Sequence, residues 1–371
     1  MQAAATFLWD VLQGRNDSRR PNVILTKFSQ IKNMNNPTAS CFNGDIIDGD
    51  CADQDNVLIQ YLANPVMFKQ VQSIQAVPIK HGSIGCVYTG LVHGEERMVC
   101  FKVIHPGIRT DIQEQSSVVS SGVNLAKFFG VSLDGADTEF TSVLIEETHL
   151  LAEAKNQAEV KGLWQDTEWL HIPMILPSLC TDNVLCSLYH PGIPLAEYIK
   201  FASASDINII CLNIARFIFR NHLVFNIFYI DIHWGNFMIC PETHQLVVVD
   251  FGAIKRFSPE KHTCIKRLYS ALIDEDYEAF LSVCLDLSIT NPGRELYQFF
   301  LVQCQPWFKS EEFQFTPTWL KDSALVKLAW IQQLKLPCEL MWLIRISVGL
   351  NGMLTHVQAH GEFYHALLDY L

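Results

Sequence analysis

The sequence predicts an α+β fold with two lobes, a strand-rich lobe followed by a mostly helical one. Three observations support it. The chain has 371 residues, more than one small core needs. Between residues 76 and 103, short apolar stretches alternate with glycines, a pattern typical of consecutive strands joined by tight turns. From about Leu195 the apolar residues recur with a helical period up to the end. The predicted domains are an N-terminal extension and linker (1–56), a strand-rich lobe (57–190) and a helical lobe (191–371).

Composition and charge exclude several classes of protein. Hydrophobic residues make up 49% of the chain and charged residues 18%, so a compact globule is expected and a disordered chain is not. The formal net charge of -12 repels phosphodiester backbones and anionic membranes. We therefore expect no nucleic-acid partner and no simple electrostatic attachment to a membrane.

The cysteines and the apolar segments bear on the compartment. The 12 cysteines include no C-x-x-C pair, which favours reduced thiols over disulfides or zinc. The first twenty residues lack a basic start and carry Asp10 within their apolar stretch, so no secretory signal is expected. The apolar run 206–230 is interrupted by Arg216, Arg220 and His222, which predicts a buried helix and strand and no transmembrane segment. We expect a reducing, cytosol-like compartment, without secretion, and leave peripheral membrane contact open.

The first half of the chain predicts these elements in order. Residues 22–32 have a helical pattern, and residues 33–56 are rich in Asn, Asp and Gly, as linkers are. A helix is predicted over 57–73 and a set of short strands over 76–103. The period becomes helical again over 142–164, with acidic residues near its start.

The second half predicts one more strand and then mainly helices. A strand-like stretch covers 176–188. The helical half that follows is interrupted by one hairpin, formed by 236–240 and 245–249 around the turn 241–244. Bilobal phosphotransferases that use nucleotides have this order of elements.

Asp250 is the first candidate for chemistry. Three valines at 247–249 form a buried strand that brings Asp250 to its end, followed by Phe251 and Gly252. A carboxylate so placed suits a divalent metal held against nucleotide phosphates. The alternative is a strand end followed by an ordinary turn.

Asp231 and Asn236 strengthen this interpretation. They are five residues apart, and Asp231 precedes Asp250 by nineteen residues. In a catalytic loop of the D-x-x-x-x-N type, the Asp orients or deprotonates a hydroxyl or water and the Asn binds a second metal. Otherwise Asp231 caps a turn and Asn236 satisfies loop backbone.

Lys102 is the candidate cation of the strand-rich lobe. It lies among apolar residues on a predicted strand, where a lysine is costly unless it is paired. The partner should be a Glu on the helix downstream. Glu153 fits best, with Glu146 and Glu147 as alternatives. Alternatively, Lys102 is an edge residue with its amine in water.

A short glycine-containing loop is the candidate phosphate contact. Gly82, Ser83 and Gly85 lie between strands, about twenty residues before the lysine, where backbone N–H groups can approach phosphates. A hairpin turn explains the same residues. Lys80 and His81, just before the loop, either add positive charge or are simply solvated.

Taken in order, these stretches resemble the UbiB-type, aarF-domain atypical kinases. The stretches are K-F-S-Q, P-I-K-H-G-S-I-G-C-V, F-K-V-I-H-P-G-I, E-T-H-L-L-A-E-A, D-I-H-W-G-N-F and V-V-D-F-G-A. The resemblance spans about Lys27 to Phe257. It implies a bilobal protein-kinase-like fold with a helical N-terminal extension, ATP and Mg²⁺ as ligands and, for many members, a link to ubiquinone or other isoprenoid-lipid metabolism. Members resemble ATPases or small-molecule kinases more than protein kinases.

The resemblance also implies a role for each matching residue. Lys102 would contact the phosphates, Glu153 would pair with it, and Asp231 would be the catalytic acid. Asn236 and Asp250 would hold metal.

Two further motifs of the family match in part. Lys27 and Gln30 would belong to the K-x-G-Q motif of an extension helix that covers the active site. Glu147 would be the first carboxylate of the E-x-D motif.

The sequence departs from the family at four places. Ser29 replaces the Gly of K-x-G-Q, Lys80 to Ser83 replace an alanine-rich phosphate loop, His149 replaces the Asp of E-x-D, and Cys86 replaces Gln. The catalytic loop and D-F-G are intact, so the first hypothesis is an ATP-dependent phosphotransferase or ATPase acting on water, a small molecule or a lipid. The alternatives are a pseudokinase that senses nucleotide, and a lipid-binding protein that uses the apolar helices of the second half.

Overall fold

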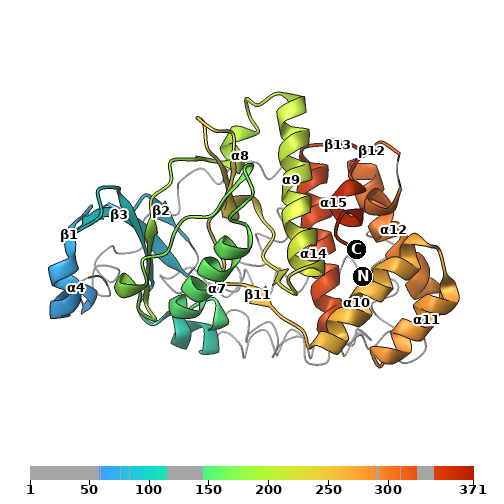
Figure 1. Cartoon of the computed structure of the whole chain (residues 1–371), viewed down its shortest axis with the longest axis horizontal. Coiled ribbons are helices and arrows are strands. Elements are labelled where there is room, and N and C mark those ends of the chain that lie inside the picture. The colour runs from blue at the N-terminus through green and yellow to red at the C-terminus, as the bar shows by residue number, and fades with distance from the viewer. Residues whose placement is uncertain are drawn as a thin grey trace. The chain divides into compact units, whose positions relative to one another are not determined.

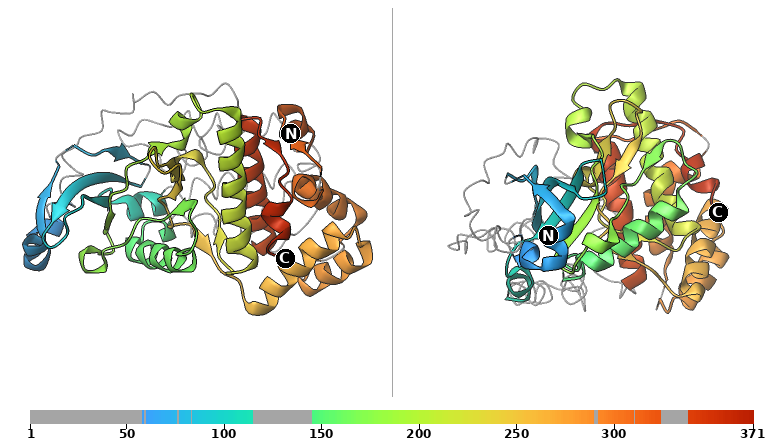
Figure 2. Two further views of the ribbon diagram at one scale, coloured as in Figure 1. Left: turned by 45° about the horizontal axis from the view of Figure 1, so that its top comes forward. Right: turned by 60° about the vertical axis from the view of Figure 1, so that its left-hand side comes forward.

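The structure is a computed structural model of the whole chain. It describes residues 58, 60–75, 77–82, 84–114, 145–289, 292–309, 311–323 and 338–371, which Figure 1 and Figure 2 show in colour. The predicted extension, with Lys27, Ser29 and Gln30, lies outside the described residues, as does Ser83.

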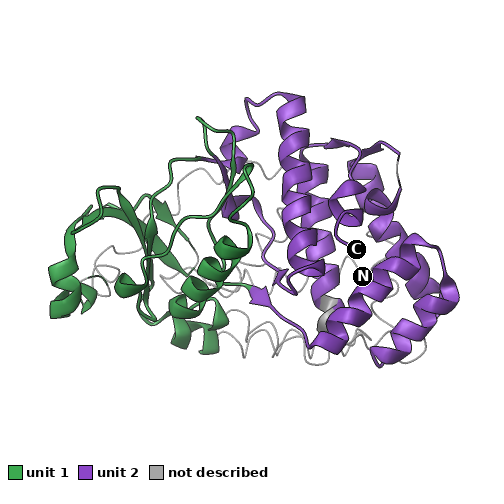
Figure 3. Ribbon diagram, viewed as in Figure 1, with its two compact units in different colours: residues 1–129, 133–192, 240–253 green, residues 130–132, 193–239, 254–371 purple. Residues whose placement is uncertain are grey.

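The described chain divides into two compact units, shown in Figure 3. The strand-rich unit contains the described parts of 58–192 together with 240–253, and the helical unit contains those of 193–239 and 254–371. The two units are described separately below.

A five-stranded antiparallel sheet forms the centre of the strand-rich unit (Figure 1). Its order is β1-β3-β4-β6, and β2 also pairs with β3. The strands are β1 (Val71–Ile74), β2 (Lys80–His81), β3 (Gly85–Val92), β4 (Val99–Ile104) and β6 (Val184–Leu188). The sequence predicted consecutive strands in this region, and the structure confirms them.

The alternation of side chains along β4 determines which face of the sheet Lys102 occupies. Val99, Phe101 and Val103 are buried in a cluster on one face of the sheet. Because successive side chains of a strand point to opposite faces, Lys102 lies on the other face. That face is covered by the helix α7 (Leu150–Leu163), whose Leu150 and Ala154 belong to a second buried cluster.

The prediction of one helix over 57–73 is wrong in its bounds. Helical residues precede Asn64, and a new helix, α4 (Pro65–Gln70), begins after it and ends before β1. The side chain of Asn64 accepts a hydrogen bond from Val66 N at 2.9 Å, and Pro65 suits a first helical position because its missing N–H needs no partner there. Residues 71–74 instead pair with β3, with Val71 opposite Val92.

The remaining elements of the strand-rich unit are short. Strand β5 (Leu170–His171) pairs in parallel with β10 (Leu246–Val248), and η1 (Pro177–Leu179) is one turn of 3-10 helix. The predicted turn 241–244 is present: Cys240 N donates to Gln245 O at 3.0 Å, and His244 N donates to Cys240 O at 2.9 Å. The pairing with β5 joins β10, and with it Asp250, to this unit.

The helical unit is built mainly from helices, several of them long (Figure 2). They are α8 (Leu195–Tyr198), α9 (Ala204–Leu223), α10 (Pro259–Ile273), α11 (Tyr277–Asp286), α12 (Arg294–Phe308), α14 (Cys338–His356) and α15 (His365–Leu368). Three strand pairs also belong to it: β7 (Ile193–Pro194) with β9 (Phe237–Ile239), β8 (Phe228–Tyr229) with β11 (Ile254–Lys255), and β12 (Phe313–Gln314) with β13 (His360–Gly361). The 3-10 turn η2 (Trp234–Asn236) precedes β9.

Helix α9 explains the long apolar run of the sequence. Ser203 caps it by accepting a hydrogen bond from Asp206 N at 3.1 Å. Ile214, Phe217 and Ile218 are fully buried, whereas Arg216 and Arg220, one turn apart, are only partly so. Within the described residues, no helix is long and apolar enough to span a membrane. The nine cysteines whose side chains the structure describes are free thiols.

His222 predicts a measurable dependence of stability on pH. Its ring is fully buried against Phe228, with centroids 4.6 Å apart, and neither ring nitrogen has a hydrogen-bond partner among the described residues. Burial, followed by His262, lowers the pKa of His222 to about 3. As the pH falls below about 6.5, the unfolded chain takes up a proton that the folded chain does not, so stability should fall by up to about 1.4 kcal/mol per pH unit.

His222→Phe should make the unfolding free energy less dependent on pH, because no proton is then taken up at position 222 on unfolding. The substitution keeps an aromatic ring against Phe228. Urea unfolding at pH 5.0, 6.0 and 7.5 measures it. His93→Gln, which changes an exposed histidine, is the control and should keep the wild-type slope. An unchanged slope in His222→Phe would contradict the prediction.

Candidate active site

Lys102, Glu153 and Asp250 meet within the strand-rich unit. The ammonium of Lys102 donates to both carboxylate oxygens of Glu153 at 2.8 Å and to Oδ2 of Asp250 at 3.1 Å. The Glu153 side chain is 1% exposed, that of Lys102 16% and that of Asp250 31%. The most accessible of the three is therefore the carboxylate of Asp250.

Helix α7 supplies Glu153 and is held in place along its length. Its buried face contains Glu153, Gln157 and Val160, spaced at three and four residues as one helical face requires. Gln157 Nε2 donates to Pro173 O at 2.8 Å, and Asn156 Nδ2 donates to Phe251 O at 3.1 Å. The second bond ties the helix to the backbone beside Asp250.

Of the three glutamates considered from the sequence, Glu153 pairs with Lys102. Glu146 and Glu147 lie before α7 begins at Leu150, so they are not on the helical face that meets β4. Glu147 is nevertheless buried, at 4% exposed.

The electrostatics of the cluster make the charge of Lys102 essential. Burial by itself would lower the pKa of Lys102, but the charges of Asp250 and Glu153 outweigh it and raise that pKa. Burial also raises the pKa of Glu153, against the opposing charge of Lys102. The ammonium of Lys102 thus favours the ionised form of Glu153, against the effect of burial.

Gly252 lies beside the cluster and binds Asp250 through its backbone. Its N–H donates to Asp250 Oδ1 at 3.0 Å. A Cβ there would lie 3.4 Å from both Asp250 Oδ1 and Glu153 Oε2, and 3.6 Å from the Cα of Glu147. A Cβ there would thus make ordinary van der Waals contacts with these groups, and the neighbouring Phe251 is fully buried.

In the glycine-containing loop after β2, the packing of the sheet explains why residue 85 is a glycine. A Cβ at Gly85 would overlap Val103 O, because β3 and β4 approach closely there. Gly82 N donates to Gly85 O at 2.8 Å, and the ring of His105 contacts Gly82 O at 3.0 Å. The sequence alternative of a tight turn thus accounts for this backbone, and Lys80 and His81 are exposed on β2 just before it.

Asp231 and Asn236 meet in the helical unit. Asn236 Nδ2 donates to the backbone O of Asp231 at 2.8 Å and to its Oδ2 at 3.1 Å. His233 Nε2 lies 3.5 Å from Asp231 Oδ2, and His233 also caps the 3-10 turn η2 by accepting from Gly235 N at 2.8 Å. The carboxylate of Asp231 is therefore held in one orientation by the loop that follows it.

Arg345 is a residue of this site that sequence reasoning missed. From α14 its Nε donates to Ile230 O at 3.1 Å, and its Nη2 lies 3.5 Å from Asp231 Oδ1. Its neighbours Trp342 and Leu343 on the same helix are buried. The available signal was a lone arginine inside an apolar helix, which needs a partner.

His149, which stands where the E-x-D motif has Asp, contacts Asp182. Its Nδ1 lies 3.1 Å from Asp182 Oδ1, and Arg109 Nη2 lies 2.8 Å from Asp182 Oδ2. His149 directly precedes α7 and is 44% exposed, so this position adds a hydrogen bond beside the surface ion pair of Arg109 and Asp182.

These units and sites define a kinase-like protein. A solved structure, the complex of Rv3197 with erythromycin from Mycobacterium tuberculosis, matches with a TM-score of 0.67 over 100% of this chain and 96% of that chain, at 20% identity. The likeness supports the α+β kinase-like fold that the sequence predicted.

The chain belongs to the ABC1 atypical kinase-like family, whose model matches residues 52–284. It is 28% identical to the atypical kinase COQ8B, mitochondrial, of Rattus norvegicus, over 59% of this chain and 41% of the relative. It is 22% identical to the probable protein kinase UbiB of Klebsiella pneumoniae, over 62% of this chain and 45% of the relative. The chain thus spans about half the length of these curated relatives, and the predicted UbiB-type resemblance is confirmed.

Proposed function

We propose that this protein binds Mg·ATP and either hydrolyses it or transfers its terminal phosphoryl group to a small-molecule or lipid acceptor. The link to isoprenoid-quinone metabolism is part of the proposal and follows from the family. The observation that carries it is the cluster in which Lys102 contacts both Glu153 and Asp250. A lysine paired with a helical glutamate, next to the Asp of D-F-G, is the arrangement by which kinase-like proteins prepare a cation for phosphate oxygens.

Each residue of the strand-rich unit has a defined part in the proposal. Glu153 fixes the position of the Lys102 ammonium, and Lys102 binds phosphate oxygens as they gain charge in the transition state. The Lys102 contact with Asp250 keeps that carboxylate directed toward the same place. Glu147, beside Gly252, adds a second buried carboxylate to this region.

The oxygen donors suit Mg²⁺. Asp250 offers a partly exposed carboxylate, and in Asn236 the amide nitrogen makes the hydrogen bonds to Asp231, so the amide oxygen is the atom suited to a metal. Hard oxygen ligands of this kind are the ones that Mg²⁺ prefers. When bound, Mg²⁺ would neutralise charge on the phosphate oxygens.

Asp231 would orient the acceptor hydroxyl or water and accept its proton. Asn236 and Arg345 hold its carboxylate from two sides, so little reorganisation is needed for it to act.

A pseudokinase that binds nucleotide without turnover is the second candidate. The loop after β2 favours it. The close packing of β4 against Gly85 already explains why a glycine stands there, and Gly85 therefore gives no independent support for phosphate binding.

Nucleotide binding and phosphate release, measured on the same preparation, test the proposal. We expect wild type to release phosphate from Mg·ATP, with and without a detergent-solubilised phenolic lipid, and Asp250→Asn to weaken Mg²⁺-dependent nucleotide binding and to abolish release. Asp274→Asn, an exposed change at the end of α10, is the matched control and should behave as wild type. Binding without release would establish the pseudokinase, and no binding would reject both candidates.

A further inference from the structure

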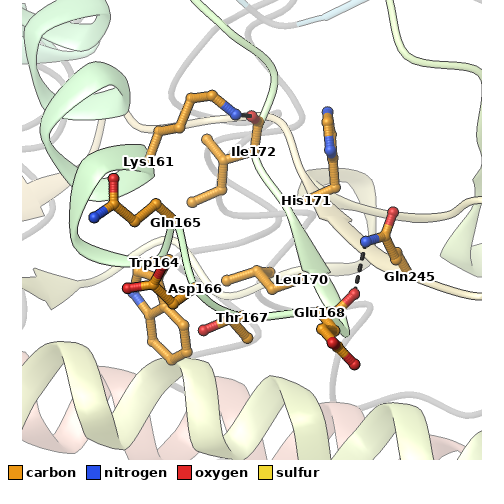
Figure 4. Close-up of a pocket in the computed structure, with 10 residues that line it drawn as sticks. All are labelled: Lys161, Trp164, Gln165, Asp166, Thr167, Glu168, Leu170, His171, Ile172 and Gln245. Carbon is orange, nitrogen blue, oxygen red and sulfur yellow. Dashed lines mark hydrogen bonds between the residues drawn. The ribbon is translucent and has the colours of Figure 1, made fainter.

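Two adjacent cavities lie in the strand-rich unit among residues that the proposed reaction does not use. The first, about 540 Å³, is lined by residues from the end of α7 through β5, and by Gln245 (Figure 4). The second, about 500 Å³, is lined mainly by residues around β6 and the segment after it, up to Pro191. Lys161 and His171 line both cavities, so the two meet at these side chains.

Lys161 is a half-buried cation without a carboxylate partner among the described residues. Its Nζ donates to the backbone O of Ile172 at 2.7 Å, the contact that Figure 4 shows as a dashed line. Burial lowers the pKa of Lys161, which is what an ammonium without a compensating charge experiences. An anionic group arriving at this position would supply the missing charge.

A pair of stacked histidines stands next to this cation. The rings of His171 and His190 are 3.9 Å apart with planes 19° from parallel. Burial first, and then nearby positive groups including Lys161, lowers the pKa of both rings. Within the described structure, Nε2 of His190 is buried and has no hydrogen-bond partner, which is costly for a polar atom.

Apolar side chains line the second cavity, and two of them are accessible. Met98 and Met174 line it and are 38% and 39% exposed, and Leu188 and Pro191 line it too. Arg97, at its edge, is paired with Glu95 at 3.0 Å. A pocket of this size, mostly apolar with a few polar groups at one end, is the usual form of a small-molecule site.

The carboxylates nearby decide where an anion would sit. Asp166 and Glu168 line the first cavity, and in Figure 4 they are drawn apart from the Lys161 ammonium and the His171 ring. Glu242 acts on His190 in the opposite sense to Lys161. An anion is therefore best accommodated at Lys161, with its apolar part in the second cavity.

We propose that these cavities form a second ligand site, which takes a small amphipathic molecule with one anionic head group. The head, a carboxylate or a phosphate, binds Lys161, and the apolar body lies against Met98 and Met174.

Calorimetric titration of the full chain with four probes tests both halves of this site. Octanoate and octyl phosphate carry head and body, octanol lacks the charge, and inorganic phosphate lacks the body. We expect the first two to bind at least ten times more tightly than the last two, and their ratio shows which head is preferred. Equal binding of octanol or of inorganic phosphate would overturn the proposal.

Variants locate the binding. Lys161→Gln removes the charge but keeps a donor for Ile172 O, and it should weaken octanoate binding at least tenfold. Lys155→Gln, on the exposed side of the same helix, is the matched control and should bind as wild type. Met174→Asp changes an exposed residue, so folding should be unaffected, and it should abolish binding by placing a carboxylate beside the body. Wild-type affinity in Lys161→Gln or Met174→Asp would overturn the assignment.

Discussion

Asp231→Asn should lower the rate of phosphate release from Mg·ATP by about 100-fold or more, because an amide cannot accept the proton of the attacking hydroxyl or water. The substitution keeps the shape of the side chain, so Arg345 and Asn236 still pack around it. Nucleotide affinity should therefore change little, and the loss should appear in kcat and not in KM. Steady-state kinetics with a coupled phosphate assay separate the two.

Asp274→Asn is again the control, since it makes the same chemical change on the surface of the same unit. Release at the wild-type rate in Asp231→Asn would show that this carboxylate does not take part in the chemistry. A loss of nucleotide binding together with rate would instead point to a role in holding the ligand.

Local sequence patterns predicted the parts of the strand-rich unit that depend on short-range rules. The apolar residues around Lys102 were sufficient to predict its strand, and three consecutive valines were sufficient to bring Asp250 to the end of a strand. The helix carrying Glu153 followed from its period. Its starting point did not, because α7 begins only at Leu150 and residues 147–148 before it form a turn.

The features that were missed depend on contacts between distant residues. Nothing local indicates that residues 71–74 leave a helix, because their pairing with β3 decides it. In the same way, Arg345 reaches Asp231 across more than a hundred residues of chain. Its role could be expected only in general terms, from the cost of an arginine among apolar neighbours.

Lys102→Met should lower the free energy of unfolding by about 3 kcal/mol at pH 7.5, because it leaves the buried carboxylate of Glu153 without its cation. Methionine keeps most of the volume of the lysine stem, so the loss reports charge and not packing. Since burial already raises the pKa of Glu153, the variant should bind a proton there when folded. Its folded state then holds more protons than its unfolded state, so its stability deficit should shrink as the pH falls toward 5.

The double variant Lys102→Met/Glu153→Gln separates the ion pair from other effects. With no carboxylate left at position 153, we expect it to be more stable than Lys102→Met alone, although Glu153→Gln by itself should destabilise wild type. Lys155→Met, on the exposed side of α7, should change stability by less than about 0.5 kcal/mol. Urea unfolding of wild type, the two single variants and the double variant gives the coupling free energy between positions 102 and 153. Simple additivity of the two single changes would mean that Lys102 and Glu153 stabilise the unit independently, and that Asp250 is sufficient to hold the ammonium in place.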